Sequence, residues 1–375
     1  MNFPRHVYLH VPFCARRCSY CDFSIAVRKR VPVSEYVNGV SLEIALRFPQ
    51  VPGVSWRADT LYLGGGTPSR LGPDGIIALL DAVRSRVTLE HGAEVTLEAN
   101  PEDVSAAAAR AWRAAGVTRV SLGAQSFSDS VLQWMHRVHD AASISTAVRD
   151  VRDAGIDSLS LDLIFALPQE VPRDWRRDLD LALALAPDHL SLYGLTVEPT
   201  TPLARWRLRG NATDAPEERY ASEFLLAHAL ATAAGLEHYE VSNFGRAGAQ
   251  ARHNASYWTG APYAGLGPSA HEFDGATRRW NVAPYVAWLS RLRGGTDPRV
   301  GAELLTAAER VEESVFLALR TSAGLPLNDR EWALAQPWLD AGWGEPRGDR
   351  LILSPEGWLR MDAIALAVVR SRLSV

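Results

Sequence analysis

Residues 8–23, YLHVPFCARRCSYCDF, contain every cysteine of this chain. Cys14, Cys18 and Cys21 follow one another with the spacing C-x3-C-x2-C. Thiolates select zinc, copper or iron–sulfur centres, and three of them on one short loop are typical of a metal cluster. A structural zinc ion would need a fourth Cys or His close by. Three thiolates on a 4Fe-4S cluster would instead leave one iron without a protein ligand, and chemistry can happen at that iron.

The alternatives are a disulfide plus a spare thiol, or three cysteines that lie together by chance. The odd number of cysteines weighs against the first, and their confinement to one loop weighs against the second. His10 precedes the loop on a predicted strand, where it alternates with Val11. We therefore interpret His10 as a wall residue and not as a metal ligand.

Composition sets limits on the class of protein. The chain has 375 residues, 47% hydrophobic and 22% charged, which suffices for one large core. We find no signal peptide before the first strand and no apolar run of the ~18 residues that a membrane span needs. Reduced cysteines suit the cytoplasm, where we expect the protein. The net charge of −4 gives no reason to expect nucleic acid, and Lys29, the single lysine, leaves almost no candidate for a Walker loop or a Schiff base.

Between Val7 and Val241, short β-rich runs alternate with longer helical patterns. This alternation predicts a parallel sheet with helical crossovers, and a whole or partial β/α barrel is favoured over an open sheet. An Ala-Gly pair, typical of a helix end, recurs before three of the strands. We predict strands near 6–10, 59–63, 94–98, 118–123, 157–163, 189–195 and 237–241, and helices near 34–47, 73–86, 104–115, 142–154, 172–185 and 217–234.

The cysteine motif, with Tyr20 at the aromatic place of C-x3-C-x-[aromatic]-C, resembles the signature of radical S-adenosylmethionine (SAM) enzymes. The lead-in 8–13, YLHVPF, is similar to that of oxygen-independent coproporphyrinogen III oxidases and of the related HemW heme chaperones. The resemblance implies a partial TIM-like (β/α)6 barrel and a 4Fe-4S cluster on Cys14, Cys18 and Cys21. It also implies SAM on the fourth iron, with Tyr8 and Tyr20 among the cofactor-binding residues.

The carboxyl ends of the predicted strands are where such barrels bind ligands. Residues 63–68, LGGGTP, form a glycine-rich loop whose exposed N–H groups suit a carboxylate. Gly65, Gly66 and Thr67 are similar to the family element that holds the amino end of SAM. Glu98 matches a family carboxylate that meets SAM, although it is also placed to be a helix-capping neighbour of Pro101.

Further cofactor residues follow from the same resemblance. Gln125 stands at the polar ligand position, and Arg137 matches an arginine that meets the SAM carboxylate, although helical arginines are usually solvated or paired. Asp162 matches the aspartate that is assigned to the nucleoside half of SAM. Thr196 lies where relatives make a backbone contact to the cofactor. Residues 165–170, FALPQE, replace two glycines of the relatives by Ala166 and Gln169, so we expect a different turn there.

A second candidate site lies in residues 252–258, RHNASYW, which show neither helical nor strand periodicity and which we predict to be an ordered loop. The alternative is a purely structural segment that packs against the barrel and fills its open side. The residues His253, Asn254, Tyr257 and Trp258 match the H-N-x-x-Y-W motif of HemW proteins, which is implicated in holding heme. His271, in GLGPSAH at 265–271, is a further candidate near the cofactor or the heme.

We predict three parts of the chain: a radical SAM partial barrel at 1–241, an ordered connection with the candidate heme loop at 242–301, and a small C-terminal domain at 302–375. The last is mainly helical and resembles a winged helix. Residues 306–375 hold eight arginines and ten acidic residues, which argues against a surface for nucleic acid phosphates. Packing or contact with a partner protein is favoured.

Three functions share this scaffold: a heme chaperone, a coproporphyrinogen III oxidase that removes two carboxyl groups as carbon dioxide, and a tRNA-modifying enzyme that the charge balance does not support. Family oxidases carry a further cysteine where this chain has Phe23, and a longer arm before the position of Tyr8. With the H-N-x-x-Y-W match, these differences favour a chaperone that binds a 4Fe-4S cluster, SAM and heme. Its expected partners are an electron donor and a heme-acceptor protein.

Overall fold

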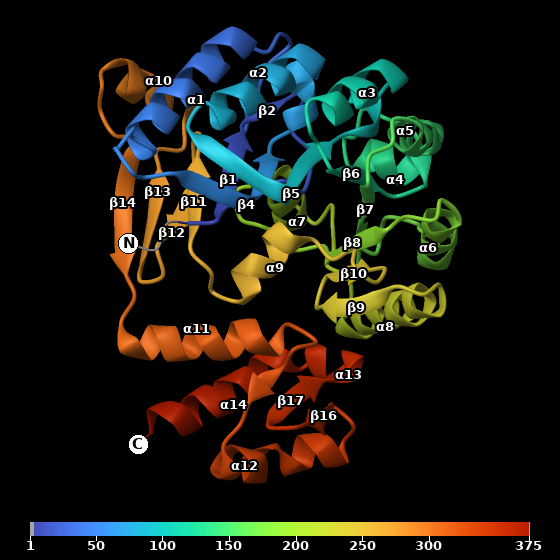
Figure 1. Ribbon diagram of the computed structural model, residues 1–375. Coiled ribbons are helices and arrows are strands. Elements are labelled where there is room, and N and C mark those ends of the chain that lie inside the picture. The colour runs from blue at the N-terminus through green and yellow to red at the C-terminus, as the bar shows by residue number, and fades with distance from the viewer. Residues whose placement is uncertain (1–3, 375) are drawn as a thin grey trace.

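The computed structural model describes residues 4–374, and within them twelve strands form one curved sheet (Figure 1). Six strands in its middle are parallel neighbours in chain order. They confirm the first six predicted strands and form the partial barrel. They are β1 (His6–Val11), β4 (Trp56–Gly65), β5 (Val87–Ala99), β6 (Arg119–Gln125), β7 (Ser158–Phe165) and β8 (His189–Gly194).

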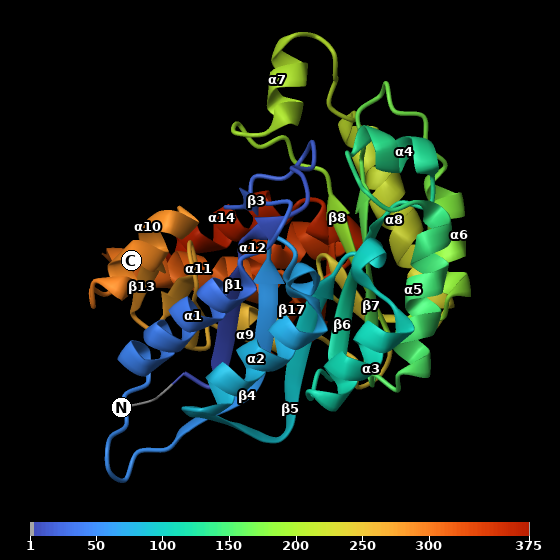
Figure 2. The ribbon, with the colours of Figure 1, turned by 90° about the horizontal axis from the view of Figure 1, so that it is seen from above.

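Helices cover the outer face of these strands, as Figure 2 shows from above. Strand β6 is buried along almost its whole length, because helices lie on one side of it and the barrel interior on the other. The predicted helices are confirmed to within a few residues. They are α1 (Val33–Arg47), α2 (Gly72–Arg84), α3 (Ala106–Ala114), α5 (Ala141–Asp153), α6 (Trp175–Ala184) and α8 (Glu217–Ala233).

The seventh predicted strand exists but does not continue the parallel barrel. Strand β9 (Glu237–Glu240) runs antiparallel to β10 (Asn243–Gly245), and β10 lies between β9 and β8. Two residues, Val241 and Ser242, join β9 to β10. So short a connection makes a hairpin, because a parallel pair needs a crossover of a dozen residues or more.

The segment after β10, which we expected to be a connection, extends the sheet past β1. Strand β11 (Tyr263–Leu266) pairs in parallel with β1, and β12 (His271–Phe273), β13 (Thr277–Asn281) and β14 (Arg299–Leu304) follow as an antiparallel meander. A Cβ atom on Gly265 would lie 1.9 Å from the carbonyl oxygen of His271. Glycine therefore permits this close approach of β11 to β12.

Residues 252–258 are not the predicted loop but helix α9 (Arg252–Trp258). The backbone N–H groups of Arg252 and His253 each donate to a carboxylate oxygen of Glu94 at 2.9 Å. Glu94 lies on β5, so the cap that satisfies the start of this helix comes from a distant part of the chain. A short helix stabilised in this way leaves little local signal in the sequence.

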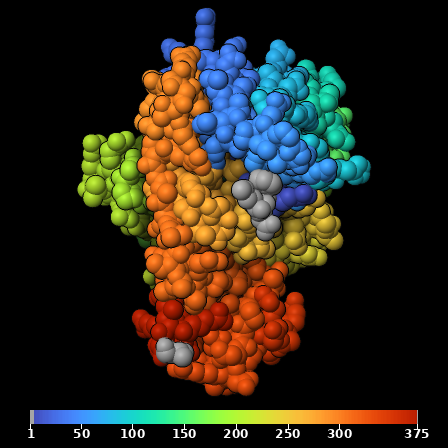
Figure 3. Space-filling view, turned by 60° about the vertical axis from the view of Figure 1, so that its left-hand side comes forward, coloured from blue at the N-terminus to red at the C-terminus, as the bar shows by residue number. Residues whose placement is uncertain are grey.

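The C-terminal part forms a separate lobe below the barrel, coloured orange to red in Figure 3. A three-stranded sheet accompanies its helices, in keeping with the expected winged character. None of the helices in residues 4–374 is long and apolar enough to cross a membrane. The elements of the lobe are α11 (Ala307–Leu319), β15 (Leu325–Pro326), α12 (Asp329–Asp340), β16 (Gly344–Arg347), β17 (Arg350–Leu353), α13 (Pro355–Trp358) and α14 (Met361–Leu373).

Candidate functional site

The cysteine loop is fixed at both ends by backbone pairing. Strands β2 (Phe13–Cys14) and β3 (Ala26–Val27) lie side by side, with Ala26 N–H donating to Pro12 C=O at 2.7 Å and Arg28 N–H to Cys14 C=O at 3.0 Å. Because the two ends are held together, residues 15–25 project as a loop beyond the carboxyl end of β1. The loop lies on the side of the barrel where α7 (Pro202–Leu208) stands out in Figure 2.

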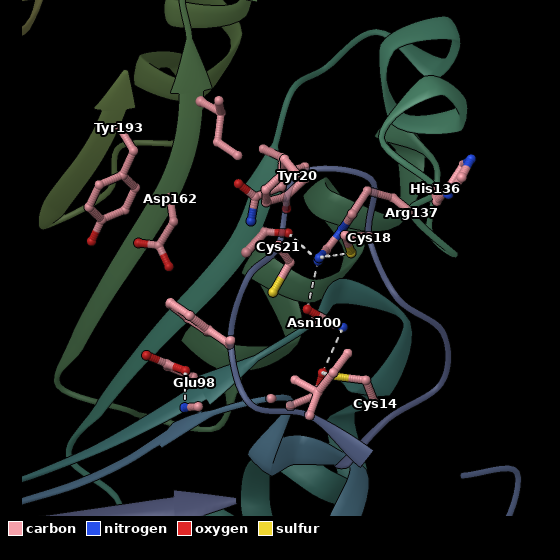
Figure 4. Close-up of a pocket in the computed structure, with 18 of the residues that line it drawn as sticks. Cys14, Cys18, Tyr20, Cys21, Glu98, Asn100, His136, Arg137, Asp162 and Tyr193 are labelled. Atoms are coloured by element: carbon pink, nitrogen blue, oxygen red, sulfur yellow. Dashed lines mark hydrogen bonds between the residues drawn. The ribbon is translucent and has the colours of Figure 1, made fainter. Parts of the chain in front are cut away.

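All three cysteines line one cavity of about 470 Å³ at the carboxyl ends of the barrel strands (Figure 4). Their thiols are free, and no three His, Cys, Asp or Glu side chains within residues 4–374 are gathered as ligands of a single metal ion. The thiols are thus spread over the cavity wall. Burial raises the pKa of Cys14, and raises that of Cys21 to about 11. These thiols hold their protons at neutral pH and release them when a metal binds.

Two glycines bring backbone to the wall of this cavity beside Cys14. Gly65 has a φ of 111°, and a Cβ atom there would lie 2.6 Å from the ring of His10. A Cβ atom on Gly66 would lie 2.8 Å from the backbone of Pro12. Only glycine fits both positions, so the loop presents backbone and not side chains to a ligand.

Two carboxylates face the cavity from strands β5 and β7, which lie on either side of β6 (Figure 4). Glu98 accepts hydrogen bonds from Tyr62 Oη at 2.7 Å and from Gly65 N–H at 3.0 Å, and desolvation raises its pKa to about 7. Asp162 accepts from the hydroxyl groups of Ser121 at 2.9 Å and Ser160 at 3.1 Å, and desolvation raises its pKa as well. Both groups are placed to receive a cation or hydroxyl groups of a ligand.

Arg137 lies across the cavity from these carboxylates (Figure 4). Its Nη2 donates to Asn100 Oδ1 at 2.6 Å and to Gly123 C=O at 2.9 Å, and its Nη1 donates to Cys18 Sγ at 3.6 Å. Its Nε is buried and has no acceptor among the described residues. A buried donor of this kind is costly unless a ligand meets it.

The backbone on this side of the cavity is strained at two residues. Gln125 and His136 line the cavity with φ angles of 63° and 60°, a region that side chains other than glycine, Asn and Asp rarely adopt. Strain of this kind clusters at ligand sites, where the surrounding structure holds it in place.

Nine predicted cofactor residues line the cavity together with the cysteines: Tyr20, Gly65, Gly66, Thr67, Glu98, Gln125, Arg137, Asp162 and Thr196. Tyr8 is outside the cavity lining. Its ring stacks on Tyr62 at 6.0 Å, and its hydroxyl group lies 3.1 Å from His10 Nδ1. Tyr8 therefore supports the wall from within the barrel.

The cavity lining also includes residues that sequence reasoning missed, among them Asn100, Ser121, His136 and Tyr193. Two of them could have been predicted from the alternation of side chains along a strand. Asn100 lies two residues after Glu98, and Ser121 lies four residues before Gln125, so each points to the same face as a residue that was predicted. Tyr193 and His136 carry no comparable signal.

The turn after β7 contains Ala166, which replaces a family glycine. Ala166 has a φ of 56°, the left-handed conformation that glycine adopts readily. Its N–H donates to Glu223 Oε2 at 2.7 Å, and this contact holds the residue in place. Ala166 thus adopts the left-handed backbone conformation that glycine favours and accepts its strain. That this turn differs from the turn of the relatives stays a prediction.

The five candidate heme residues do not line one common cavity. His253 is fully buried, with Nδ1 at 2.7 Å from Thr60 Oγ1 and Nε2 at 2.9 Å from Tyr257 Oη, and burial lowers its pKa to about 3. The Trp258 indole instead lines a second cavity, between α9 and α11. His271 is exposed on β12, where its ring stacks on that of Trp280.

The first cavity has the features that an iron–sulfur cluster with an organic cofactor requires. It offers three free thiols, an arginine on one side, and two carboxylates on the other. The unpaired N–H of Arg137 supports a ligand with acceptor oxygens.

Comparisons with known proteins agree with this chemistry. The model of the radical SAM superfamily matches residues 8–182. The heme chaperone HemW of Mycobacterium tuberculosis (strain ATCC 25618 / H37Rv) is 39% identical over 367 residues, which cover 96% of this chain and 94% of that protein. HemW of Bacillus subtilis is 33% identical and covers 86% of this chain and 84% of its own length.

Among solved structures, coproporphyrinogen III oxidase (HemN) from Escherichia coli, a radical SAM enzyme, superposes with a TM-score of 0.82. The match covers 97% of this chain and 89% of that chain, with 22% sequence identity. At this identity the likeness establishes the fold alone.

Proposed function

The chain belongs to the radical SAM superfamily and, within it, to the family of HemW heme chaperones, and from this premise we propose that it binds heme and delivers it to acceptor proteins. Membership of the superfamily implies a 4Fe-4S cluster and SAM. The observation that carries the proposal is the 39% identity to a heme chaperone over 96% of the chain, both lobes included.

We propose that Cys14, Cys18 and Cys21 hold the cluster in the first cavity. When bound and reduced, the cluster and SAM supply an electron and a source of radical chemistry. The unpaired Nε of Arg137 supports its assignment to the SAM carboxylate, since guanidinium groups bind carboxylates well. A separate protein would deliver the electron.

Glu98 and Asp162 would contact two other parts of SAM. Glu98 retains acceptor capacity beyond its two hydrogen bonds, which suits the SAM amino group. Asp162 is held by serine hydroxyl groups and suits the ribose hydroxyl groups. Gly65, Gly66 and Thr196, which line the same cavity, would supply close backbone contacts.

The heme would involve the H-N-x-x-Y-W residues. Of these, Trp258 lines a cavity, whereas the fully buried His253 has both ring nitrogens engaged in contacts within the protein. His271 and Asn254 remain predictions without a defined contact to a ligand cavity. The acceptor protein and a cytoplasmic location are likewise predictions.

The second candidate function is coproporphyrinogen III oxidation, the activity named for HemN, whose fold this chain shares. At the mouth of the first cavity this chain has Phe23, 56% exposed, where family oxidases carry a cysteine. An apolar ring there cannot replace a thiol in redox or proton-transfer chemistry, and this difference favours the chaperone.

The deciding experiment is anaerobic. The cluster is reconstituted in the full-length protein, SAM and a reductant are added, and heme and coproporphyrinogen III are offered separately. We expect stoichiometric heme uptake, read as a shifted heme absorbance band, without release of carbon dioxide. Decarboxylation of coproporphyrinogen III would select the oxidase instead.

A further inference from the structure

A chain of hydrogen bonds crosses the barrel interior and joins the two cavities. Asp162, which lines the first cavity, accepts from Ser160 Oγ at 3.1 Å, and Ser160 Oγ lies 2.8 Å from His189 Nδ1. His189 Nε2 lies 2.7 Å from the hydroxyl oxygen of Tyr239, and Tyr239 lines the second cavity, of about 540 Å³. Hydrogen bonds thus connect the lining of one cavity to the lining of the other.

Strands β7, β8 and β9 supply the residues of this chain. Ser160 and Asp162 lie two residues apart on β7, so their side chains point to the same face of the sheet. His189 on β8 pairs with Ser160, and Tyr239 lies on β9. The exposed fractions of Ser160, His189 and Tyr239 are 0%, 1% and 6%. The three linking side chains are therefore shielded from bulk water.

The direction of the chain follows from the groups that can only donate or only accept. An ionised Asp162 only accepts, so the hydroxyl hydrogen of Ser160 points to it. Ser160 Oγ then accepts the Nδ1–H of His189, and because a neutral imidazole has one N–H, Nε2 accepts from the Tyr239 hydroxyl group. The backbone N–H of Ala251 donates to Tyr239 Oη at 3.3 Å. Every hydrogen of the chain thus points towards Asp162.

The charges around the chain favour this arrangement. Burial, with a further contribution from the cation of Arg119, lowers the pKa of His189 well below its ordinary value, so the ring is neutral. Desolvation raises the pKa of Asp162, whereas serine hydroxyl groups and Arg119 favour its ionised form. The negative charge of the chain therefore lies on Asp162. The other ionisable groups that face the two ends are Glu98, Tyr62 and Tyr193 at Asp162, and Glu240 and Glu94 at Tyr239.

We infer that Tyr239, His189 and Ser160 form a relay that carries protons between the second cavity and Asp162. In the forward direction the Tyr239 proton moves to His189 Nε2, the Nδ1 proton moves to Ser160, and the Ser160 proton moves to Asp162. Water that enters the second cavity returns a proton to Tyr239, and the reverse transfers remove the proton from Asp162. Asp162 can then change its charge while a cofactor fills the first cavity. The inference goes beyond the proposed function, because it does not depend on heme.

Infrared spectroscopy after a rapid drop in pH tests the relay in the full-length, cluster-reconstituted protein saturated with SAM. The band of the protonated Asp162 carboxyl group should grow in the wild type, and Asp162→Asn identifies this band by its absence. Tyr239→Phe should slow the growth at least about tenfold, because it removes the hydroxyl group at which protons enter. Tyr285→Phe is the matched control and should leave the rate unchanged. Tyr285 is 7% exposed, and its hydroxyl group donates to Glu35, outside the chain.

A second variant breaks the chain at another link. Ser160→Ala adds no volume and removes the contacts to both Asp162 and His189, so it should slow the growth of the band by a similar factor. An unchanged rate in either Tyr239→Phe or Ser160→Ala would overturn the inference. A wild-type Asp162 band that does not respond to the drop in pH would overturn it as well.

Nuclear magnetic resonance of protein with isotope-labelled histidine tests the direction of the chain, with His189→Gln to assign the signals. We expect His189 to carry its proton on Nδ1 in the wild type. A neutral His189 with its proton on Nε2 would contradict the relay, because Ser160 would then have no donor behind it.

Discussion

Glu98 is the residue whose protonation should govern cofactor binding. Desolvation raises its pKa to about 7, so Glu98 takes up a proton as the pH falls through this value. The positively charged amino group of SAM would pair with the ionised carboxylate of Glu98. Bound SAM would therefore oppose protonation of Glu98. We therefore expect SAM affinity to fall by up to about tenfold per pH unit as the pH drops below 7.

Isothermal titration of the reconstituted protein with SAM across this range measures the effect. Glu98→Gln should bind SAM weakly at every pH, with the slope removed. An equally steep slope in the variant would show that another group is responsible.

Gly65 allows a second prediction at the residue scale. Gly65→Ala combines a left-handed φ with a contact of 2.6 Å to the His10 ring, so it should cost about 1–3 kcal/mol and reduce cluster reconstitution. Gly92→Ala is the matched control, because Gly92 has a φ of 72° and no atom within 4 Å of an added Cβ. Chemical denaturation and iron content report the two effects. Equal losses in both variants would mean that the backbone angle alone matters.

Helix α9 depends on an acceptor from another element. Glu94→Ala frees the N–H groups of Arg252 and His253, and the lost cap should cost about 1–2 kcal/mol. Heme uptake should weaken while the cluster spectrum is retained, because Glu94 does not line the cysteine cavity. Glu90→Ala, on the same strand, breaks only ion pairs with the exposed Arg5 and Arg57 and should cost under about 1 kcal/mol. A cluster lost together with the heme would contradict this separation of the two sites.

At the scale of elements, the parts readable from sequence are those with a local or periodic signal. The barrel strands and their helices alternate with clear periods, and Cys14, Cys18 and Cys21 stand on one loop. Many lining residues of the first cavity could be predicted, because they stand at the carboxyl ends of the strands. Asn100 and Ser121 could have been added, because residues two or four positions apart on a strand point to the same face. Features that depend on contacts between residues far apart in the chain could not be predicted from the sequence.

Three features illustrate such distant contacts. Helix α9 is capped by Glu94, and strand β11 comes close to β12 at Gly265. Trp258 and His253 belong to one motif in the sequence, yet they face different surroundings once the helix forms. Neither their separation nor the second cavity could be predicted, because α11 supplies the facing wall.

At the scale of the molecule, the β11–β14 extension is held to the barrel by a buried carboxylate. Glu43 on α1 accepts hydrogen bonds from Gly267 N–H and Trp288 Nε1 at 2.8 Å and from Asn281 Nδ2 at 2.6 Å. Glu43→Ala leaves these buried donors unpaired and should lower the free energy of unfolding by about 3–5 kcal/mol.

The control for this prediction lies on the same helix. Glu35 contacts Tyr285 and Arg293 near the surface, so Glu35→Ala should cost under about 1 kcal/mol. Urea unfolding monitored by circular dichroism compares the two variants. A loss at Glu43 no larger than that at Glu35 would show that the extension is anchored elsewhere.

The central claim is that three cysteines hold a 4Fe-4S cluster with one iron left for SAM. Electron paramagnetic resonance of the reconstituted, reduced protein tests it most directly, with the Cys14→Ala, Cys18→Ala and Cys21→Ala variants as controls. We predict a reduced-cluster signal in the wild type that changes shape when SAM is added, and no such signal in any variant. A wild-type spectrum that saturating SAM leaves unchanged, or a full signal in one of the variants, would contradict the account.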